Sequence, residues 1–418
     1  MVGRAHGIVK AALLALSAAA ASCFGHLPPC PAAGGPAWTE LESAHFRLRT
    51  DEPPAQARAA LTDLERLEAA LLFLFEAPPD LDTGRVPVVL VDRGWTDFAP
   101  RQIGGYTFGS VLFQPLIVMA SVSALAREEL IKHELVHYLS LQVIPRQPPW
   151  LSEGLATYYQ SIEYDAASGR VTVGRPPPDL LRVAQQFRAA SVESIFSARA
   201  IDGDDASHFY ADAWLTVHYL MNHRRTALNS YEDALHDGAS LEAAWTEAFG
   251  AQTPAALALE VQRYLDGGQY ALLTYHLPAR EPPAAAERRL TDADVHATRA
   301  LLYLTGAQTR ADAPELAIAP EAPLAGARRE VEAALRQDPD HVVAGAIAHF
   351  VLKAPLDVAK AAALSQRHGD DWLAWLLLAV AREEHGDRDG SKRAGLKALE
   401  LSRSDRSIQL RGPLARTN

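Results

Sequence analysis

The sequence predicts an α+β protein with two folded parts: a mixed domain at 38–276 and an α-helical repeat domain at 287–405. Strand and helix patterns alternate between residues 38 and 120, whereas the chain after residue 287 is almost wholly helical in pattern. With 418 residues, 48% of them hydrophobic, the chain is long enough for two or three domains with buried cores.

The N-terminus has the pattern of a secretory signal at 1–22. Arg4 and Lys10 precede an uncharged run rich in Ala and Leu at 11–21, which is too short to span a membrane. We therefore expect export to the bacterial cell envelope, with the mature chain in the periplasm or lipid-anchored to a membrane.

Two cysteines follow in the predicted linker 23–37. The run Ala20-Ala21-Ser22-Cys23 resembles a bacterial lipoprotein box, although Ala20 stands where that pattern prefers Leu. The resemblance implies lipidation of Cys23 and a membrane anchor. The alternative is cleavage nearby, which would leave Cys23 and Cys30 able to form a small disulfide loop in an oxidising compartment.

The first elements alternate in type. A two-residue alternation at the end of 38–50 predicts a half-buried strand, helical spacing predicts a helix at 54–76, and an apolar run predicts a strand at 86–91. The glycine-rich segment 104–109 predicts a turn that leads into a strand at 111–119. Pro115 in that run favours an edge strand.

The second half of this domain is predicted to be mainly helical, and its helices share apolar positions at helical spacing. The expected helices are 124–142, one beginning at Leu151, 207–223 and 255–265. A Pro/Ala-rich linker at 277–286 ends the domain. After it, Ala334 and Ala398 lie in similar contexts about two 34-residue periods apart, which resembles tetratricopeptide helix pairs. A generic helical bundle is the alternative, and 406–418 is a tail.

The most specific motif is His133-Glu134-Leu135-Val136-His137 within the predicted helix 124–142. Two histidines four residues apart lie on one helical face, so both imidazoles can approach one metal ion. Two ligands alone bind zinc weakly. Glu153 follows in Trp150-Leu-Ser-Glu-Gly-Leu-Ala156, at the start of the next predicted helix, and is the candidate third ligand.

This pattern resembles the gluzincin zinc peptidases, and more narrowly the bacterial peptidase MA-like families with C-terminal helical repeats, over about 38–270. The resemblance implies a zincin-like fold with Zn²⁺ held by His133, His137 and Glu153. It implies that Glu134 is the general base that takes a proton from the attacking water. A downstream Tyr or His then stabilises the transition state, and Tyr210 is the candidate.

The resemblance also implies that the strand at 111–119 binds an extended peptide by main-chain pairing. The sequence departs from thermolysin-like enzymes at Thr157, where those enzymes carry an Asp that orients a histidine ligand. This departure leaves open which residue orients the histidine ligands. Among the other histidines, His218 lies in an apolar helical run and is predicted to belong to the core.

The expected partners are a peptide or protein substrate and a protein bound by the helical repeats. The net charge of −11 and the lack of a Lys/Arg cluster argue against nucleic-acid binding. Two alternatives remain. The motif histidines could be ordinary helix residues, or the domain could be an inactive zincin scaffold whose repeats bind a cell-envelope partner.

Overall fold

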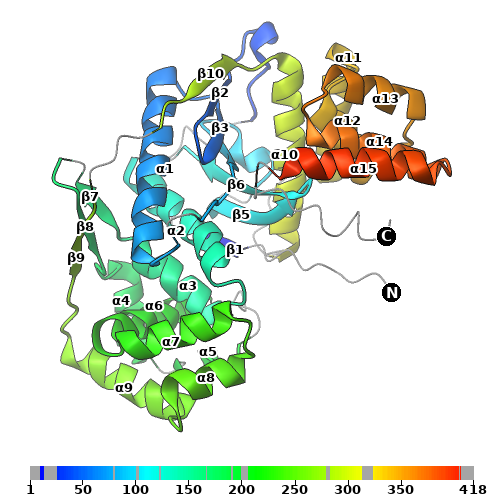
Figure 1. Cartoon of the computed structure of the whole chain (residues 1–418). Helices are drawn as coiled ribbons and strands as arrows, with labels where there is room; N and C mark the ends of the chain where they lie inside the picture. Colours follow the sequence, from blue (N-terminus) through cyan, green and yellow to red (C-terminus); the bar gives the residue numbers. More distant parts are fainter. Residues whose placement is uncertain are drawn as a thin grey trace. The chain divides into compact units, whose positions relative to one another are not determined.

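The computed structural model describes residues 10–13, 26–78, 81–99, 103–121, 124–165, 167–189, 192–198, 206–278, 283–312, 323–403 and 405. These residues form many helices and two β-sheets, which confirms the predicted mixed α+β class (Figure 1). Among them, no helix is both long and apolar enough to cross a membrane.

The chain forms two compact units. Unit 1 comprises 1–62, 82–123 and 283–418, and unit 2 comprises 63–81 and 124–282, so that helix α1 (Pro54–Leu74) begins in one unit and ends in the other. The chain returns to unit 1 at Pro283, inside the predicted linker. The predicted boundaries at 276 and 287 stay predictions.

Unit 1 is built on a seven-stranded sheet with the order β1-β5-β6-β4-β3-β2-β10. β4 pairs parallel with β3 on one side and with β6 on the other, and the remaining pairs are antiparallel. The strands are β1 (Lys10–Leu13), β2 (Thr39–Glu42), β3 (Phe46–Thr50), β4 (Val86–Val91), β5 (Ile103–Val111), β6 (Gln114–Ala120) and β10 (Ala286–Arg289).

The strand predicted at the end of 38–50 is a hairpin of β2 and β3. The Ser43 amide donates to the Phe46 carbonyl at 3.0 Å, which closes the turn between them. β3 shows the expected alternation, since Phe46 and Leu48 are fully buried while Arg47 and Arg49 are partly exposed. The predicted strand 86–91 and helix 54–76 are confirmed as β4 and α1.

Two predictions around the glycine-rich segment are wrong. Residues 104–109 belong to strand β5, and the hairpin turn lies at Leu112 and Phe113. β6 is an interior strand because it pairs with β5 on one side and β4 on the other. Pro115 is tolerated because β4 begins to pair only at Ile117 and the pairing with β5 is irregular before Leu116.

Strand β1 comes from the segment predicted to be a cleaved signal. It pairs antiparallel with β5, with Lys10 opposite Thr107 and Leu13 opposite Ile103. Removal of residues 1–22 would leave a six-stranded sheet with β5 as its edge. Cys23 lies outside the described residues, and Cys30 has a free thiol.

After β10, the described residues of unit 1 are mainly helical, as predicted for 287–405. Helix α10 meets the sheet closely: the Tyr106 hydroxyl lies 2.9 Å from Thr305 Oγ1, and a side chain at Gly306 would collide with the Phe98 carbonyl. α10 packs on α11, and α14 packs on α15 (Figure 1). The helices are α10 (Asp292–Asp312), α11 (Pro323–Gln337), α12 (Val342–Phe350), α13 (Val358–Arg367), α14 (Trp372–Glu384) and α15 (Arg388–Ser402). Their assignment to tetratricopeptide repeats stays a prediction.

Unit 2 is mainly helical, with a small antiparallel sheet of the order β7-β8-β9. Its helices after α1 are α2 (Ala124–Val143), α3 (Pro149–Tyr159), α4 (Pro178–Phe187), α5 (Val192–Ile195), α6 (Ala206–His223), α7 (Arg225–His236), α8 (Leu241–Phe249) and α9 (Pro254–Gly267). Its strands are β7 (Glu163–Asp165), β8 (Arg170–Val173) and β9 (Leu273–His276).

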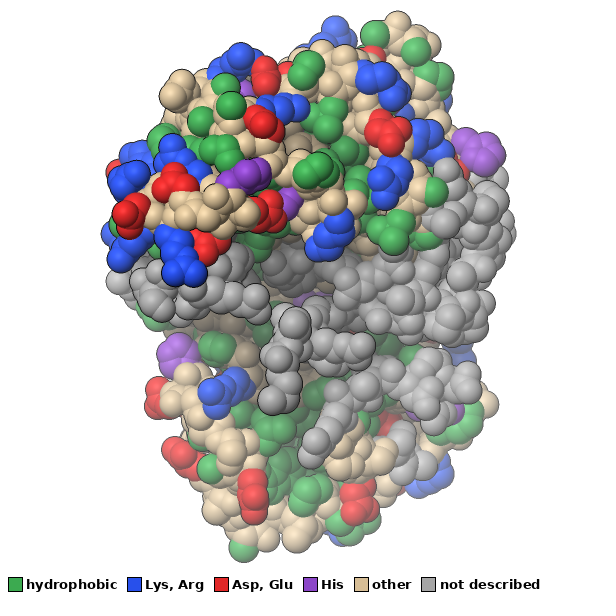
Figure 2. Space-filling view, turned by 90° about the vertical axis from the view of Figure 1, so that its right-hand side faces the viewer, with side chains coloured by type: hydrophobic (Ala, Val, Ile, Leu, Met, Phe, Trp, Pro, Cys, Tyr) green, Lys and Arg blue, Asp and Glu red, His purple; other side chains and the backbone are tan. Residues whose placement is uncertain are grey.

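On the face in Figure 2, basic and acidic side chains lie interspersed over the described surface.

Candidate metal centre

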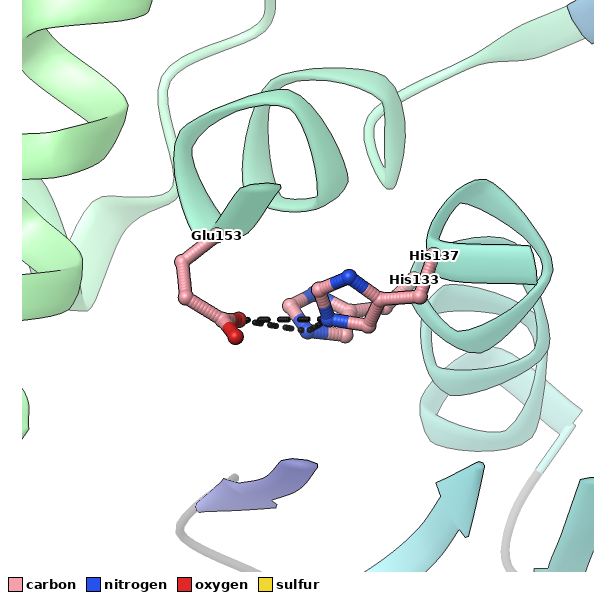
Figure 3. Close-up of side chains that lie close together, drawn as sticks. All are labelled: His133, His137 and Glu153. Atoms are coloured by element: carbon pink, nitrogen blue, oxygen red, sulfur yellow. Dashed lines mark hydrogen bonds and ion pairs between the residues drawn. The ribbon is translucent and has the colours of Figure 1, made fainter. Parts of the chain in front are cut away.

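The predicted metal ligands come together on two consecutive helices of unit 2. His133 and His137 project from one face of α2, and Glu153 projects toward them from the first turns of α3 (Figure 3). All three side chains are buried, with the Glu153 side chain fully so. α3 begins directly after Pro148, with Pro149 as its first residue, which fixes where the helix starts and therefore where Glu153 lies.

The three ligand atoms are spaced as a tetrahedral ion requires. His133 Nε2 and His137 Nε2 lie 3.1 Å apart, and Glu153 Oε2 lies 3.5 Å from the first and 3.2 Å from the second. Zinc–ligand distances of about 2.0–2.1 Å in a tetrahedron separate the ligand atoms by about 3.3 Å. The residues present therefore fit a zinc ion with three protein ligands and one open position.

Both histidines are oriented by a second hydrogen bond. His133 Nδ1 lies 3.1 Å from Gln160 Oε1, and His137 Nδ1 lies 3.2 Å from Ser152 Oγ. With Nε2 directed toward the metal position, the proton of each ring resides on Nδ1 and is donated to these oxygens. Gln160 and Ser152 therefore take the orienting role left open by Thr157, which is buried elsewhere on α3.

No expectation from the sequence included Gln160 or Ser152, the two residues that orient the histidines. Gln160 lies seven residues after Glu153, which places both on one face of α3, and Ser152 immediately precedes Glu153. The helical spacing from Glu153 could have pointed to Gln160. No sequence signal distinguishes Ser152 from an ordinary helix serine.

Glu134 and Tyr210 lie close enough to the ligands to influence them electrostatically. Glu134 is fully buried on α2, and its charge contributes to raising the pKa of His133. The Tyr210 ring centroid lies 6.5 Å from that of His133. Burial, together with the charges of Glu153 and Glu134, raises the pKa of Tyr210 well above its usual value of 10.0. Tyr210 therefore keeps its proton at neutral pH and can act as a hydrogen-bond donor.

The charge of the site favours a bound cation. Glu134 and Glu153 are both fully buried, and buried carboxylates are stabilised by pairing with a positive charge. Burial alone lowers the pKa of His133, but the hydrogen bond that His133 donates to Glu153 and the charge of Glu134 outweigh it and raise that pKa. Two neutral imidazoles and a carboxylate are also the donor set that zinc prefers in sites with an open position.

Close packing of α3 against α6 explains why a glycine, Gly154, follows Glu153. A Cβ atom at Gly154 would lie 2.4 Å from Val217 Cγ2 and 2.6 Å from the Ala213 carbonyl oxygen of α6. The absence of a side chain lets α3 and α6 approach closely. This contact fixes the depth of Glu153 relative to the helix that carries Tyr210.

The predicted core role of His218 agrees with its contacts. Its Nε2 donates to the Gly174 carbonyl at 2.9 Å, and its Nδ1 lies 2.8 Å from the Tyr264 hydroxyl. The side chain is fully buried, and burial lowers its pKa. His218 is therefore a hydrogen-bonded core residue.

A buried two-histidine, one-carboxylate cluster on consecutive helices defines this chain as a candidate mononuclear metal-site protein. Residues 129–239 match a family model described as a protein of unknown function (DUF1570). The match covers about a quarter of the chain and contains all three candidate ligands, Glu134 and Tyr210. No curated protein matches the chain.

Proposed function

We propose that the protein is an exported zinc-dependent metallopeptidase of the gluzincin type, with a zincin-like catalytic domain. The observation that carries the proposal is the spacing of 3.1–3.5 Å among the buried ligand atoms of His133, His137 and Glu153. Beside these ligands lies Glu134, a carboxylate that the metal does not need. This is the arrangement of a hydrolytic site rather than a closed structural one.

Each residue has a distinct task in this proposal. Zinc, when bound, polarises the scissile carbonyl and lowers the pKa of water at the site. Glu134 accepts the proton of the attacking water and passes it to the leaving amine. Tyr210 donates a hydrogen bond to the carbonyl oxygen as negative charge develops on it. Gln160 and Ser152 hold the two imidazoles in position.

The substrate in this proposal is a peptide or protein. Within unit 1, β5 is a candidate edge for pairing with an extended chain. Removal of the predicted signal exposes β5 as a sheet edge, because its outer neighbour in the structure is β1. An antiparallel segment of this chain already pairs with β5 at Tyr106 and Thr107, so the backbone there accepts a strand. β6, which holds most of the segment 111–119 predicted to pair with a peptide, already pairs with β5 and β4, so β5 rather than β6 can offer a free edge.

The location and the protein partner are also proposals. We place the mature chain in the bacterial cell envelope, anchored through lipidated Cys23 if the lipoprotein box is used. A partner bound by the helical repeats would have to use a surface other than the one that the chain's own hairpin covers. Leu112 and Phe113 pack against the apolar cluster of α12 and α14, and the Phe113 ring centroid lies 5.3 Å from that of Phe350.

The test compares the wild-type protein with Glu134→Gln on an unfolded protein such as reduced casein, with mass spectrometry of the fragments. Glu134→Gln should retain zinc and lose activity by about 10²–10⁴-fold, since it removes the proton acceptor. Glu247→Gln, an exposed glutamate of the same unit, is the matched control and should keep full activity. Cleavage by Glu134→Gln at the wild-type rate would refute the peptidase proposal.

A further inference from the structure

A second cluster of reactive side chains lies in unit 1 around the free thiol of Cys30. This residue precedes a short 3-10 helix, η1 (Pro31–Ala33), and its carbonyl accepts hydrogen bonds from Ala33 and Gly35. Cys30 is 7% exposed, so the residue is buried apart from a small part of its surface. The full sequence contains one other cysteine, Cys23.

The Cys30 thiol contacts a histidine, and that histidine is hydrogen-bonded to a carboxylate. His296 of α10 places its Nε2 3.4 Å from Cys30 Sγ, and its Nδ1 lies 2.6 Å from Glu330 Oε2 of α11. Glu330 therefore accepts the Nδ1 proton and orients the ring. The sulfur lies beside this ring, 3.4 Å from Nε2 and 3.8 Å from Nδ1. Nucleophile, base and orienting acid in this order are the arrangement that activates catalytic thiols.

The segment that carries Cys30 is tied to α10 on both sides of the thiol. The Ala32 amide donates to the Asp292 carboxylate at 3.2 Å, and Arg299 Nη2 donates to the Pro28 carbonyl at 2.8 Å. Asp292 and Arg299 lie about one turn before and one turn after His296 on the same helix. These bonds hold the sulfur at the imidazole ring.

The charges around His296 favour its protonated form. The hydrogen bonds with Cys30 and with Glu330 raise the pKa of His296 from 6.5 to about 9. Glu330 is itself flanked by Arg329, whose Nη2 lies 3.9 Å from Glu330 Oε1. An imidazolium beside a sulfur stabilises the thiolate, which is the form that attacks electrophiles.

We propose that Cys30, His296 and Glu330 form a nucleophilic thiol site that captures small disulfides by thiol–disulfide exchange. The Cys30 thiolate attacks one sulfur of the incoming disulfide, a new S–S bond forms and the old one breaks. The leaving thiolate takes a proton from the His296 imidazolium, so the products are a mixed disulfide and a free small thiol. The chain from residue 31 onward has no cysteine to resolve the mixed disulfide. With the Cys23 thiol lipidated, as proposed above, no second thiol of the chain is available, and the adduct persists until an external thiol removes it.

The test measures the rate at which the folded protein reacts with bis(2-hydroxyethyl) disulfide, a small neutral probe. The adduct is assigned to Cys30 by peptide mass spectrometry, and the same protein unfolded in urea is the reference. The rate of an ordinary thiol should rise about tenfold for each unit that the pH rises, up to its pKa of about 8.5. The folded protein should instead react faster than the unfolded reference near pH 6.5, and its rate should rise less steeply with pH.

Two variants distinguish a Cys30 thiol that is activated by His296 from one that is only buried. His296→Gln should restore the pH slope of the unfolded reference and lower the rate near pH 6.5 by about tenfold or more. Glu330→Gln should produce a smaller shift in the same direction, because it acts by orienting His296. His385→Gln, an exposed histidine of the same unit, is the control and should have no effect.

The wild-type profile decides the proposal even if a variant fails to fold. A folded-state rate that follows the unfolded reference at every pH would show an unactivated thiol. No adduct on the folded protein after the reference has reacted fully would show an inaccessible one. Either result overturns the proposal.

Discussion

The close approach of α3 and α6 at Gly154 gives a prediction that links the packing of unit 2 to its metal centre. The Cβ atom of Gly154→Ala would lie 2.4 Å from Val217 Cγ2 and 2.6 Å from the Ala213 carbonyl oxygen. Ordinary contacts between such atoms are about 3.5–4.0 Å, so the helices must separate by about 1 Å. The Val217 side chain can adjust by itself, whereas the Ala213 carbonyl oxygen moves only with the backbone of α6.

The expected loss of stability follows from two opposing terms. Overpacking of a buried contact destabilises by about 1–3 kcal/mol, and the fixed backbone atom favours the upper end. Alanine is favoured over glycine within a helix by about 1 kcal/mol. The net decrease in the free energy of unfolding should therefore be about 2 kcal/mol. Urea denaturation of the metal-free protein measures it.

The same displacement should weaken the metal site, because Glu153 adjoins Gly154. Movement of α3 changes the Glu153 distances of 3.2 and 3.5 Å to the two histidines. We expect zinc affinity, measured by competition with a chromophoric chelator, to fall about tenfold. Gly267→Ala is the matched control, since a Cβ there meets no atom within 4 Å. If Gly154→Ala were as stable as Gly267→Ala and bound zinc equally well, the reasoning would be refuted.

Three further predictions follow from the structure. Gln160→Leu removes the acceptor of the His133 Nδ1 proton at 3.1 Å and should lower zinc affinity about 10–100-fold in the same chelator competition. If Tyr210 donates to the developing oxyanion, Tyr210→Phe should lower kcat by about 10²–10³-fold with KM little changed, and an unchanged kcat would exclude this role. Burial, with the charge of Asp92, raises the pKa of Asp51 from 3.8 to about 6, so the folded state binds this proton more tightly than the unfolded state. Stability should therefore fall as pH rises from about 4 to about 6, by up to about 3 kcal/mol, and Asp51→Asn should abolish the decline in urea titrations.

The sequence predicted the helices and the common face of His133 and His137 well, because both depend on local spacing. The helix expected at 124–142 is observed as Ala124–Val143, and the one expected at 207–223 as Ala206–His223. The four-residue spacing of His133 and His137 fixes their common face whatever surrounds the helix. The hydrogen bonds that Ser152 and Gln160 make with the two histidines depend instead on how α3 packs against α2.

The strands were predicted less well, because pairing partners decide them. β10 (Ala286–Arg289) is exposed along its whole length and has no apolar alternation, and it is a strand only because it pairs with β2. The hairpin turn at Leu112 and Phe113 has positive φ angles of 47° and 69° at residues that rarely adopt them. The packing of Phe113 against Phe350 and Trp372 accounts for that turn, and no local sequence signal marks it.

The central claim is that His133, His137 and Glu153 hold one zinc ion. The most direct measurement is the metal content of the mature protein, purified without added zinc, by inductively coupled plasma mass spectrometry. His137→Ala is measured beside it, with His276→Ala as an exposed histidine control from the same unit. We expect about one zinc per chain in the wild type and the control, and near loss of zinc in His137→Ala. Absence of zinc from the wild type, or full retention by His137→Ala, would contradict it.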